Sequence, residues 1–218
     1  MTPRAVVFDM DGVLTDTESV WDEVRRGLAA EEGLPWPAGA TRAMMGMSTQ
    51  EWSGYLVGTV GLSGTAEEAA RRTIDALAQR YAVDLPALPG AVDAVRRLAA
   101  RWPLGLASSS PRRLIDVSLT ILGIAAEFRV TVSTEEVGRG KPAPDGYLRA
   151  CELLGADPAQ CVAIEDSSNG LRAAAAAGMA VIAVPRPDFP PAPGALELAD
   201  AVVPHLDDVT LDLVEGLR

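Results

Sequence analysis

Short, unbroken apolar runs that stop abruptly at a polar residue constrain the fold of this chain more than any other feature of its sequence. Three of them end in this way: residues 5–8 before Asp9, 104–107 before Ser108, and 161–164 before Glu165. Three more follow the same pattern less sharply, the last being the weakest: residues 128–132, 180–184 and 201–203. Apolar runs without alternation are typical of parallel strands that are covered on both faces. Helical patterns lie between most of the runs, so we predict an α/β fold built on a doubly wound parallel sheet.

One interval, from Asp9 to the run at residues 104–107, is far longer than a crossover between neighbouring parallel strands requires. Its pattern indicates helices only, because apolar residues recur at helical spacing in residues 20–28. Two segments also fit the capping-box pattern of a helix start: Ser48 to Glu51 and Thr65 to Glu68. We therefore predict two domains, an α/β core of residues 1–15 and 88–218 and an inserted α-helical cap domain of residues 16–87, hinged on two short linkers.

The acidic composition limits the partners of the chain. Lys and Arg number 19 against 30 Asp and Glu, which gives a formal charge of −11 in 218 residues. Nucleic acid and anionic membranes both need a basic surface, so we expect neither as a partner. The single histidine, His205, excludes a histidine metal cluster. Cys151 and Cys161 form no C-x-x-C pair, and Asp9 comes before any apolar region of signal-peptide length, so we expect a cytoplasmic location.

The residues after the first predicted strand are the most informative part of the sequence. In an extended segment, residues two apart point the same way, so Asp9 and Asp11 should face one volume while Met10 points into the protein. Two carboxylates this close repel each other, and a hard divalent cation relieves that repulsion. Gly12 would let the backbone turn away tightly. A surface turn is the alternative for such a segment, but its place directly after a buried strand favours a site.

Polar residues at the other strand ends should join this pair, because ligands of open parallel sheets sit beyond the carboxyl ends of the strands. Ser108 begins a segment that is typical of a helix start, which is also a place where anions bind. Glu165 and Asp166 precede another helix, whose N-terminus attracts carboxylates on its own account. Asp166 would nevertheless complete an oxygen-only ligand set with Asp9 for Mg²⁺. Lys141, commonly a solvated surface charge, lies here between glycines and prolines that hold the chain rigid.

Four segments in this order resemble the motifs of the haloacid dehalogenase (HAD) superfamily phosphatases. They are DMDGVLTD at residues 9–16, Ser108, GKPAPD at residues 140–145 and IEDSSNG at residues 164–170. The chain is similar to the branch with a helical cap between the first and second core strands, close to β-phosphoglucomutases and phosphoglycolate phosphatases. The resemblance covers nearly the whole chain and implies a Rossmann-like HAD core, with the first strand central and flanked by the second and fourth.

The resemblance also implies roles for the candidate residues. They are Asp9 as nucleophile, Asp11 as general acid and base, Ser108 and Lys141 as phosphate ligands, and Asp9, Asp166 and the backbone carbonyl of Asp11 as magnesium ligands supported by Glu165. Further candidates for contact with the phosphate or the substrate are Gly12, Ser109, Thr17, Ser48 and Thr49. Specificity should lie in the cap, near Thr17, Glu18, Trp21, Met44 and residues 48–51, with Met47 and Trp52 as further candidates for substrate contact.

The expected function is a Mg²⁺-dependent phosphatase that forms an aspartyl-phosphate on Asp9 and hydrolyses a small phosphate ester, either a sugar phosphate or a phosphoglycolate-like compound. A sugar-phosphate mutase is the main alternative. Thr49 stands where the resembling mutases carry an arginine and Trp21 where they carry a histidine, although Arg42 could replace that arginine. A dehalogenase would not need Asp11, and a non-catalytic binding protein would not need every catalytic position filled.

Overall fold

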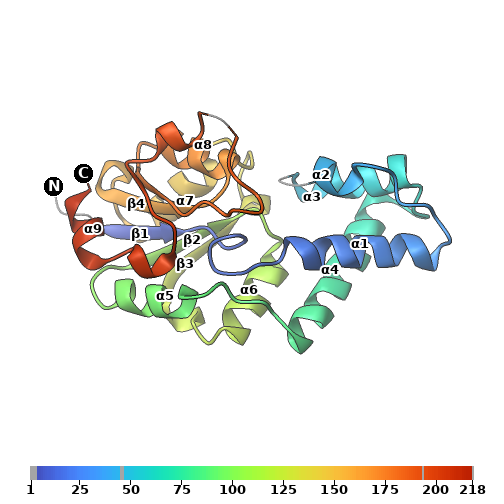
Figure 1. The fold of residues 1–218 in the computed structure, drawn as a ribbon, viewed down its shortest axis with the longest axis horizontal. Helices are drawn as coiled ribbons and strands as arrows, with labels where there is room; N and C mark the ends of the chain where they lie inside the picture. Colours follow the sequence, from blue (N-terminus) through green and yellow to red (C-terminus); the bar gives the residue numbers. More distant parts are fainter. Residues whose placement is uncertain (1–3, 45–46, 193, 218) are drawn as a thin grey trace.

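A parallel sheet forms the centre of the computed structural model, which describes residues 4–44, 47–192 and 194–217 (Figure 1). Within these residues the sheet has six strands in the order β3-β2-β1-β4-β5-β6. Their bounds are Ala5–Phe8 (β1), Leu104–Ser108 (β2), Phe128–Ser133 (β3), Cys161–Glu165 (β4), Ala180–Ala183 (β5) and Ala201–Val202 (β6). All six predicted strands are confirmed, and β1 lies between β2 and β4 as expected. The weakest of the predicted runs, residues 201–203, forms the short edge strand β6.

Helices cover both faces of the sheet, which confirms the doubly wound α/β fold (Figure 1). Those of the core are α5 (Ala91–Ala99), α6 (Arg112–Ile121), α7 (Asp145–Leu154), α8 (Ser168–Ala176) and α9 (Leu211–Gly216). Short 3₁₀ helices connect them at Ala125–Glu127, Thr134–Glu136, Pro158–Gln160, Leu196–Leu198 and Leu206–Asp208.

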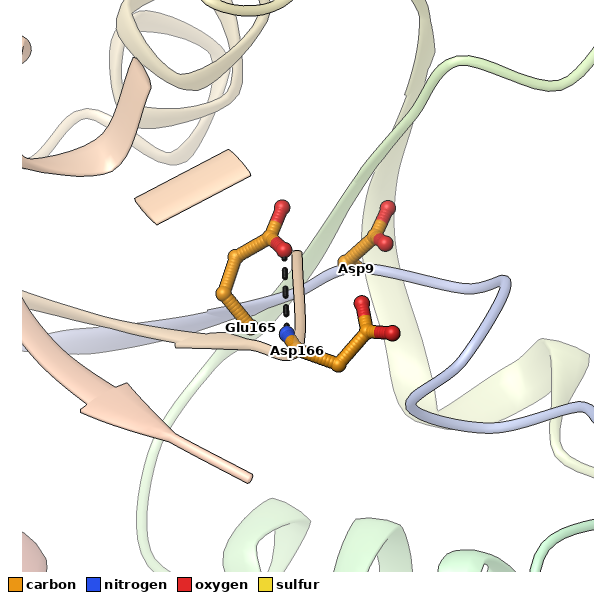
Figure 2. A group of neighbouring side chains, drawn as sticks. All are labelled: Asp9, Glu165 and Asp166. Carbon is orange, nitrogen blue, oxygen red and sulfur yellow. Dashed lines mark hydrogen bonds between the residues drawn. The ribbon is translucent and has the colours of Figure 1, made fainter. Parts of the chain in front are cut away.

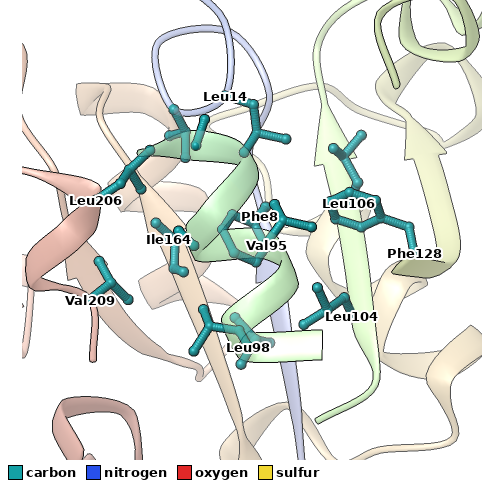
Figure 3. Packing of buried hydrophobic residues seen from close by; sticks show 14 of the residues in the cluster. Phe8, Leu14, Val95, Leu98, Leu104, Leu106, Phe128, Ile164, Leu206 and Val209 are labelled. Carbon is teal, nitrogen blue, oxygen red and sulfur yellow. The ribbon is translucent and has the colours of Figure 1, made fainter. Parts of the chain in front are cut away.

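Strand β1 shows how the sheet is buried from both sides. Val6 and Phe8 belong to one hydrophobic cluster, packed against α5, whereas Ala5 and Val7 belong to another, packed against α7 and α8. Figure 3 shows the first cluster, with Phe8 of β1 and Val95 of α5 near its centre. Alternate residues of one strand thus serve two cores, which is why the strand is apolar throughout. This burial fixes where the strand ends and so where the next residue, Asp9, projects.

The interval between β1 and α5 folds into helices with a hydrophobic cluster of their own. These helices are α1 (Glu18–Glu31), α2 (Ala40–Met44), α3 (Thr49–Tyr55), a π-helical turn (Leu56–Val60) and α4 (Ala66–Val83). Both predicted capping boxes are confirmed, at the starts of α3 and α4. Trp21, Trp52 and Tyr81 are the large aromatic side chains of this cluster, and Leu114 of α6 joins it from the core.

The two linkers between these helices and the core lie side by side. Thr15 and Ala87 form an antiparallel bridge, Asp16 N–H donates to the Pro86 carbonyl at 2.8 Å, and the Leu88 N–H donates to Leu14 at 3.0 Å. Placing the domain boundaries at 15–16 and 87–88 stays a prediction. Across the described ranges, no helix combines the length and the apolar character that spanning a bilayer would require.

Candidate active site

Three carboxylates meet at the carboxyl ends of β1 and β4. Asp9 follows β1, Glu165 ends β4 and Asp166 follows it, and Figure 2 shows the three side chains converging from these neighbouring strands. One oxygen from each lies within 4.8 Å of the others. All three residues are buried, with 6% of Asp9, 0% of Glu165 and 8% of Asp166 exposed. The sequence prediction that distant acidic residues meet at one edge of the sheet therefore agrees with the geometry.

The ammonium of Lys141 lies inside this carboxylate group. Its Nζ donates to Oδ1 of Asp9 at 2.7 Å and to Oε1 of Glu165 at 2.5 Å. The lysine side chain is 7% exposed, so it is a buried charge and not a solvated one. An ammonium in this position stabilises two carboxylates at once and fixes the orientation of Asp9.

Glu165 is held from several sides. Its Oε1 accepts from the Tyr147 hydroxyl at 2.8 Å as well as from the lysine, and its Oε2 accepts from the backbone N–H groups of Asp166 and Ser167 and from the Ser167 hydroxyl, at 3.1, 3.2 and 3.1 Å. A Cβ on Gly170 would overlap this carboxylate. With its oxygens so fully engaged, Glu165 is suited to position Lys141, in keeping with the supporting role expected of it.

Asp11 faces the same volume as Asp9 but has different partners. The Thr17 hydroxyl donates to Oδ1 at 2.5 Å, and the Ser110 and Ser108 hydroxyls donate to Oδ2 at 2.7 and 3.5 Å. Met10 between the two aspartates is fully buried, as predicted. The Asp11 carboxylate is therefore oriented by hydroxyls and kept apart from the three-carboxylate cluster, and its expected metal contact through the backbone carbonyl stays a prediction.

The serine segment that begins at the end of β2 places its residues differently from the sequence expectation. Ser108 is fully buried, and its Oγ accepts from the Ser110 N–H at 3.0 Å. Ser109 and Ser110 line the cavity above Asp9, whereas Ser108 is not among its described wall residues. The contact of Ser108 with a phosphate stays a prediction. Sequence reasoning did not single out Ser110, although it belongs to the same serine run.

Burial and mutual repulsion change the pKa values of the acidic cluster. Burial, followed by the charge of Glu165, raises the pKa of Asp9 to about 7 despite the nearby Lys141. Burial, followed by the charges of Glu165 and Asp9, raises the pKa of Asp166 well above its usual value. Burial by itself would lower the pKa of Lys141, but Asp9 and Glu165 raise it above its usual range. The protein thus concentrates more negative charge here than one ammonium neutralises.

A divalent cation fits this cluster. Asp166 Oδ1 is buried and has no hydrogen-bond partner in the part of the chain that the structure describes. A Cβ on Gly12 would overlap the Asp166 carboxylate, so a glycine at a φ of +88° leaves the space that this side chain needs. Buried carboxylate oxygens, with one of them unpaired, are the donors that Mg²⁺ prefers. Asp9 and Asp166 are the residues that would hold such an ion.

A cavity of about 870 Å³ lies between the acidic cluster and the helices of the interval between β1 and α5. Its wall on the side of these helices includes Glu18, Trp21, Arg25, Met44 and Trp52. Four of these, Glu18, Trp21, Met44 and Trp52, were named from the sequence as candidates to lie near the substrate.

Three other cap candidates are placed outside the cavity wall, as far as the described residues show. Thr17 is buried beneath Asp11, Ser48 is occupied in its capping box with Glu51, and Thr49 donates to Glu135 of the core at 2.5 Å. Their contact with a substrate stays a prediction. Sequence reasoning missed Arg25 and Arg186, which both line the cavity, because no local pattern distinguishes these arginines from surface ones.

Comparison with known proteins agrees with this geometry. A model of the family described as haloacid dehalogenase-like hydrolase matches residues 3–178. Hexitol phosphatase B of Escherichia coli K12 is 34% identical, over 96% of this chain and 96% of its own length. A phosphorylated carbohydrates phosphatase of Thermotoga maritima is also 34% identical, over 81% and 82% of the two chains.

Among solved structures, a putative β-phosphoglucomutase from Thermotoga maritima is 31% identical and superposes with a TM-score of 0.77 over 98% of this chain and 100% of its own. The relatives named here agree with the predicted enzyme class, phosphoric monoester hydrolase. The match to the family model covers well over half of the chain, so this chain belongs to the haloacid dehalogenase-like hydrolases.

Proposed function

We propose that the chain is a Mg²⁺-dependent phosphatase that hydrolyses a small phosphorylated metabolite, a sugar phosphate or a phosphoglycolate-like compound, through an aspartyl-phosphate on Asp9. The observation that carries this proposal is the placement of the Asp9 carboxylate at the floor of the cavity, 2.7 Å from Lys141 and beside Asp166. The named phosphatases among its relatives support the same reaction class.

The residues divide the reaction into two displacements. Asp9, oriented by Lys141, attacks the phosphorus, and Asp11 protonates the leaving oxygen of the ester. Asp11 then takes a proton from the water that hydrolyses the aspartyl-phosphate. Lys141 offsets charge on the phosphoryl oxygens, and Ser109 and Ser110 stand on the cavity wall beside them. A magnesium ion at Asp9 and Asp166 would supply further charge stabilisation when bound.

The helices of residues 16–87 act in this proposal as a cap that excludes bulk water and contacts the organic part of the substrate. Three observations support this role of the helices: their separate hydrophobic cluster, the paired linkers, and the cavity wall that they share with the core.

The experiment measures phosphate released from para-nitrophenyl phosphate with and without Mg²⁺. Asp9→Asn should abolish release, whereas the matched control Asp212→Asn, at an exposed position of α9, should leave it unchanged. If the wild type and Asp9→Asn are equally inert towards every ester tried, the chain is a binding protein on this fold and the proposal is wrong.

A sugar-phosphate mutase remains the second candidate, because Arg42 lines the cavity and a putative β-phosphoglucomutase is among the similar structures. Thr49 argues against it, since its hydroxyl is bonded to Glu135 and lies outside the described wall. Incubation with β-glucose 1-phosphate and a trace of the bisphosphate separates the two candidates. Glucose 6-phosphate that forms faster than free phosphate would identify a mutase.

A further inference from the structure

Arg25 of α1 is a buried cation for which the described residues offer no hydrogen-bonding partner. The residue is 6% exposed and lines the cavity. Its Nε is fully buried and unpaired, and none of its nitrogen atoms makes a hydrogen bond or ion pair within the described ranges. The guanidinium lies over the rings of Trp21 and Trp52, with its Cζ 4.6 and 5.1 Å from the ring centroids. A buried guanidinium with its donors unused is costly unless a ligand satisfies them.

The neighbouring arginine shows that this position is unusual. Arg26 donates to Asp22 at 2.6 Å and to the Thr41 hydroxyl at 3.0 Å, and the same Thr41 donates to Asp22. Asp22 is thereby engaged with Arg26 and Thr41, although its charge also opposes the lowering of the Arg25 pKa that burial causes. Among the described residues, the exposed Arg26 thus has polar partners, whereas the buried Arg25 has none and lines the cavity.

Glu18 presents the complementary group on the same face of α1. Residues 18, 21 and 25 are spaced by three and four, so Glu18, Trp21 and Arg25 form one stripe, and all three line the cavity. Glu18 makes no hydrogen bond or ion pair in the described part of the chain, and it is not within ion-pair distance of Arg25. Burial, then the charge of Asp11, raises the pKa of Glu18.

This stripe has a direction relative to the reacting centre. Burial and then the charge of Asp11 raise the pKa of Glu18, so Glu18 lies near the reacting centre. Burial lowers the pKa of Arg25, and the groups whose charge opposes this lowering are Glu18, Asp22 and Tyr81. Seven residues along a helix separate two α-carbons by about 10 Å. A substrate whose phosphate lies at Asp9 would therefore meet Glu18 near its ester bond and Arg25 at its far end.

An acceptor and a cationic donor on one wall select hydroxyl groups over anions. A carboxylate or second phosphate would pair with Arg25, but Glu18 and the acidic cluster would repel it. A hydroxyl, in contrast, donates to Glu18 and accepts from Arg25. We propose that Glu18 and Arg25 are specificity-determining residues that bind the hydroxyls of a five- or six-carbon sugar or polyol monophosphate. This inference rests on the proposed function and decides between its two substrate classes.

The test compares Arg25→Met with Arg71→Met, an exposed arginine of α4 outside the described cavity wall. The substrates are glucitol 6-phosphate, glycerol 3-phosphate, 2-phosphoglycolate and para-nitrophenyl phosphate. Arg25→Met should lower kcat/KM for glucitol 6-phosphate by about 10- to 100-fold, the effect of losing a charged hydrogen bond. Its activity on the aryl phosphate and on the three-carbon ester should stay within about twofold of Arg71→Met, which also shows that the variant is folded.

Glu18→Gln provides an independent second variant. It should lower kcat/KM for both hydroxyl-bearing esters, including glycerol 3-phosphate, and leave the aryl phosphate unaffected. The inference is overturned if Arg25→Met lowers activity on all four esters equally, if it lowers none, or if the wild type prefers 2-phosphoglycolate and Arg25→Met abolishes that preference.

Binding to Asp9→Asn separates this inference from the proposed function. Calorimetric titration of that inactive background with glucitol 6-phosphate should show binding that Arg25→Met weakens by about tenfold or more. If the wild type hydrolyses nothing, the proposed function fails, but this titration still decides whether Arg25 binds a polyol phosphate. Equal affinity with and without Arg25 would refute the inference whatever the catalytic result.

Discussion

Gly12→Ala is expected to inactivate the enzyme with little more loss of stability than a glycine replacement elsewhere. Gly12 has a φ of +88°, so an alanine there is strained by about 1–2 kcal/mol. Its methyl carbon would also lie 2.5 Å from Cγ of Asp166, about 1 Å inside the usual carbon–carbon contact of about 3.5 Å. The Asp166 carboxylate must move by that amount, and a displacement of about 1 Å in an active site lowers the rate about 100-fold.

Gly178→Ala is the matched control, because Gly178 has a φ of +81° and a Cβ there would meet nothing within 4 Å. Both variants should lose similar stability in urea unfolding, whereas Gly12→Ala alone should lose about 100-fold in phosphate release and need more Mg²⁺ for half-maximal activity. Activity of Gly12→Ala within a few fold of Gly178→Ala would refute the steric reasoning.

Three further predictions concern the same site. Tyr147→Phe removes a hydroxyl that donates to buried Glu165 and should lower the free energy of unfolding by about 1–3 kcal/mol in urea, so an unchanged value would contradict the assigned contact. Mg²⁺ at 100 times its Kd should stabilise the protein by about 2.7 kcal/mol, seen as a higher Tm, and the same rise in Asp166→Asn would count against the metal site. Ser110→Ala removes a donor to Asp11 and should lower kcat about tenfold with little change in KM, whereas a change in KM alone would argue for substrate contact instead.

The sheet and the reacting end of the site were predictable because both follow from the strands. A strand that is apolar on both faces can be recognised in the sequence as an unbroken apolar run, and the carboxyl ends of parallel strands meet at one edge of the sheet. Asp9 and Asp166 therefore came together as expected, from the ends of adjacent β1 and β4. Lys141 is different, because its burial depends on how residues 138–145 return to the sheet, and the resemblance to known motifs indicated its role more clearly than its spacing did.

The cap side of the site was less predictable, because side-chain direction on short helices depends on long-range packing. Ser48 was expected near the substrate, yet its hydroxyl completes the capping box that the sequence itself predicts, so the helix start and the substrate contact were competing uses of one side chain. Thr49 bonds to Glu135, a contact across 86 residues of sequence that no local pattern indicates. Arg25 looks like any helical surface arginine until Trp21 is seen beside it.

The two ends of the cavity differ in how their polar groups are satisfied, and this difference separates catalysis from specificity. At the reacting end, Lys141 and Glu165 have protein partners that fix them before any substrate arrives, so the geometry for phosphoryl transfer is preorganised. At the other end, Glu18 and Arg25 have none among the described residues, and in the proposed function they would bind the organic part of the ester. A substitution at the reacting end should therefore lower the activity on every ester alike, whereas one at the other end should change the order in which esters are preferred.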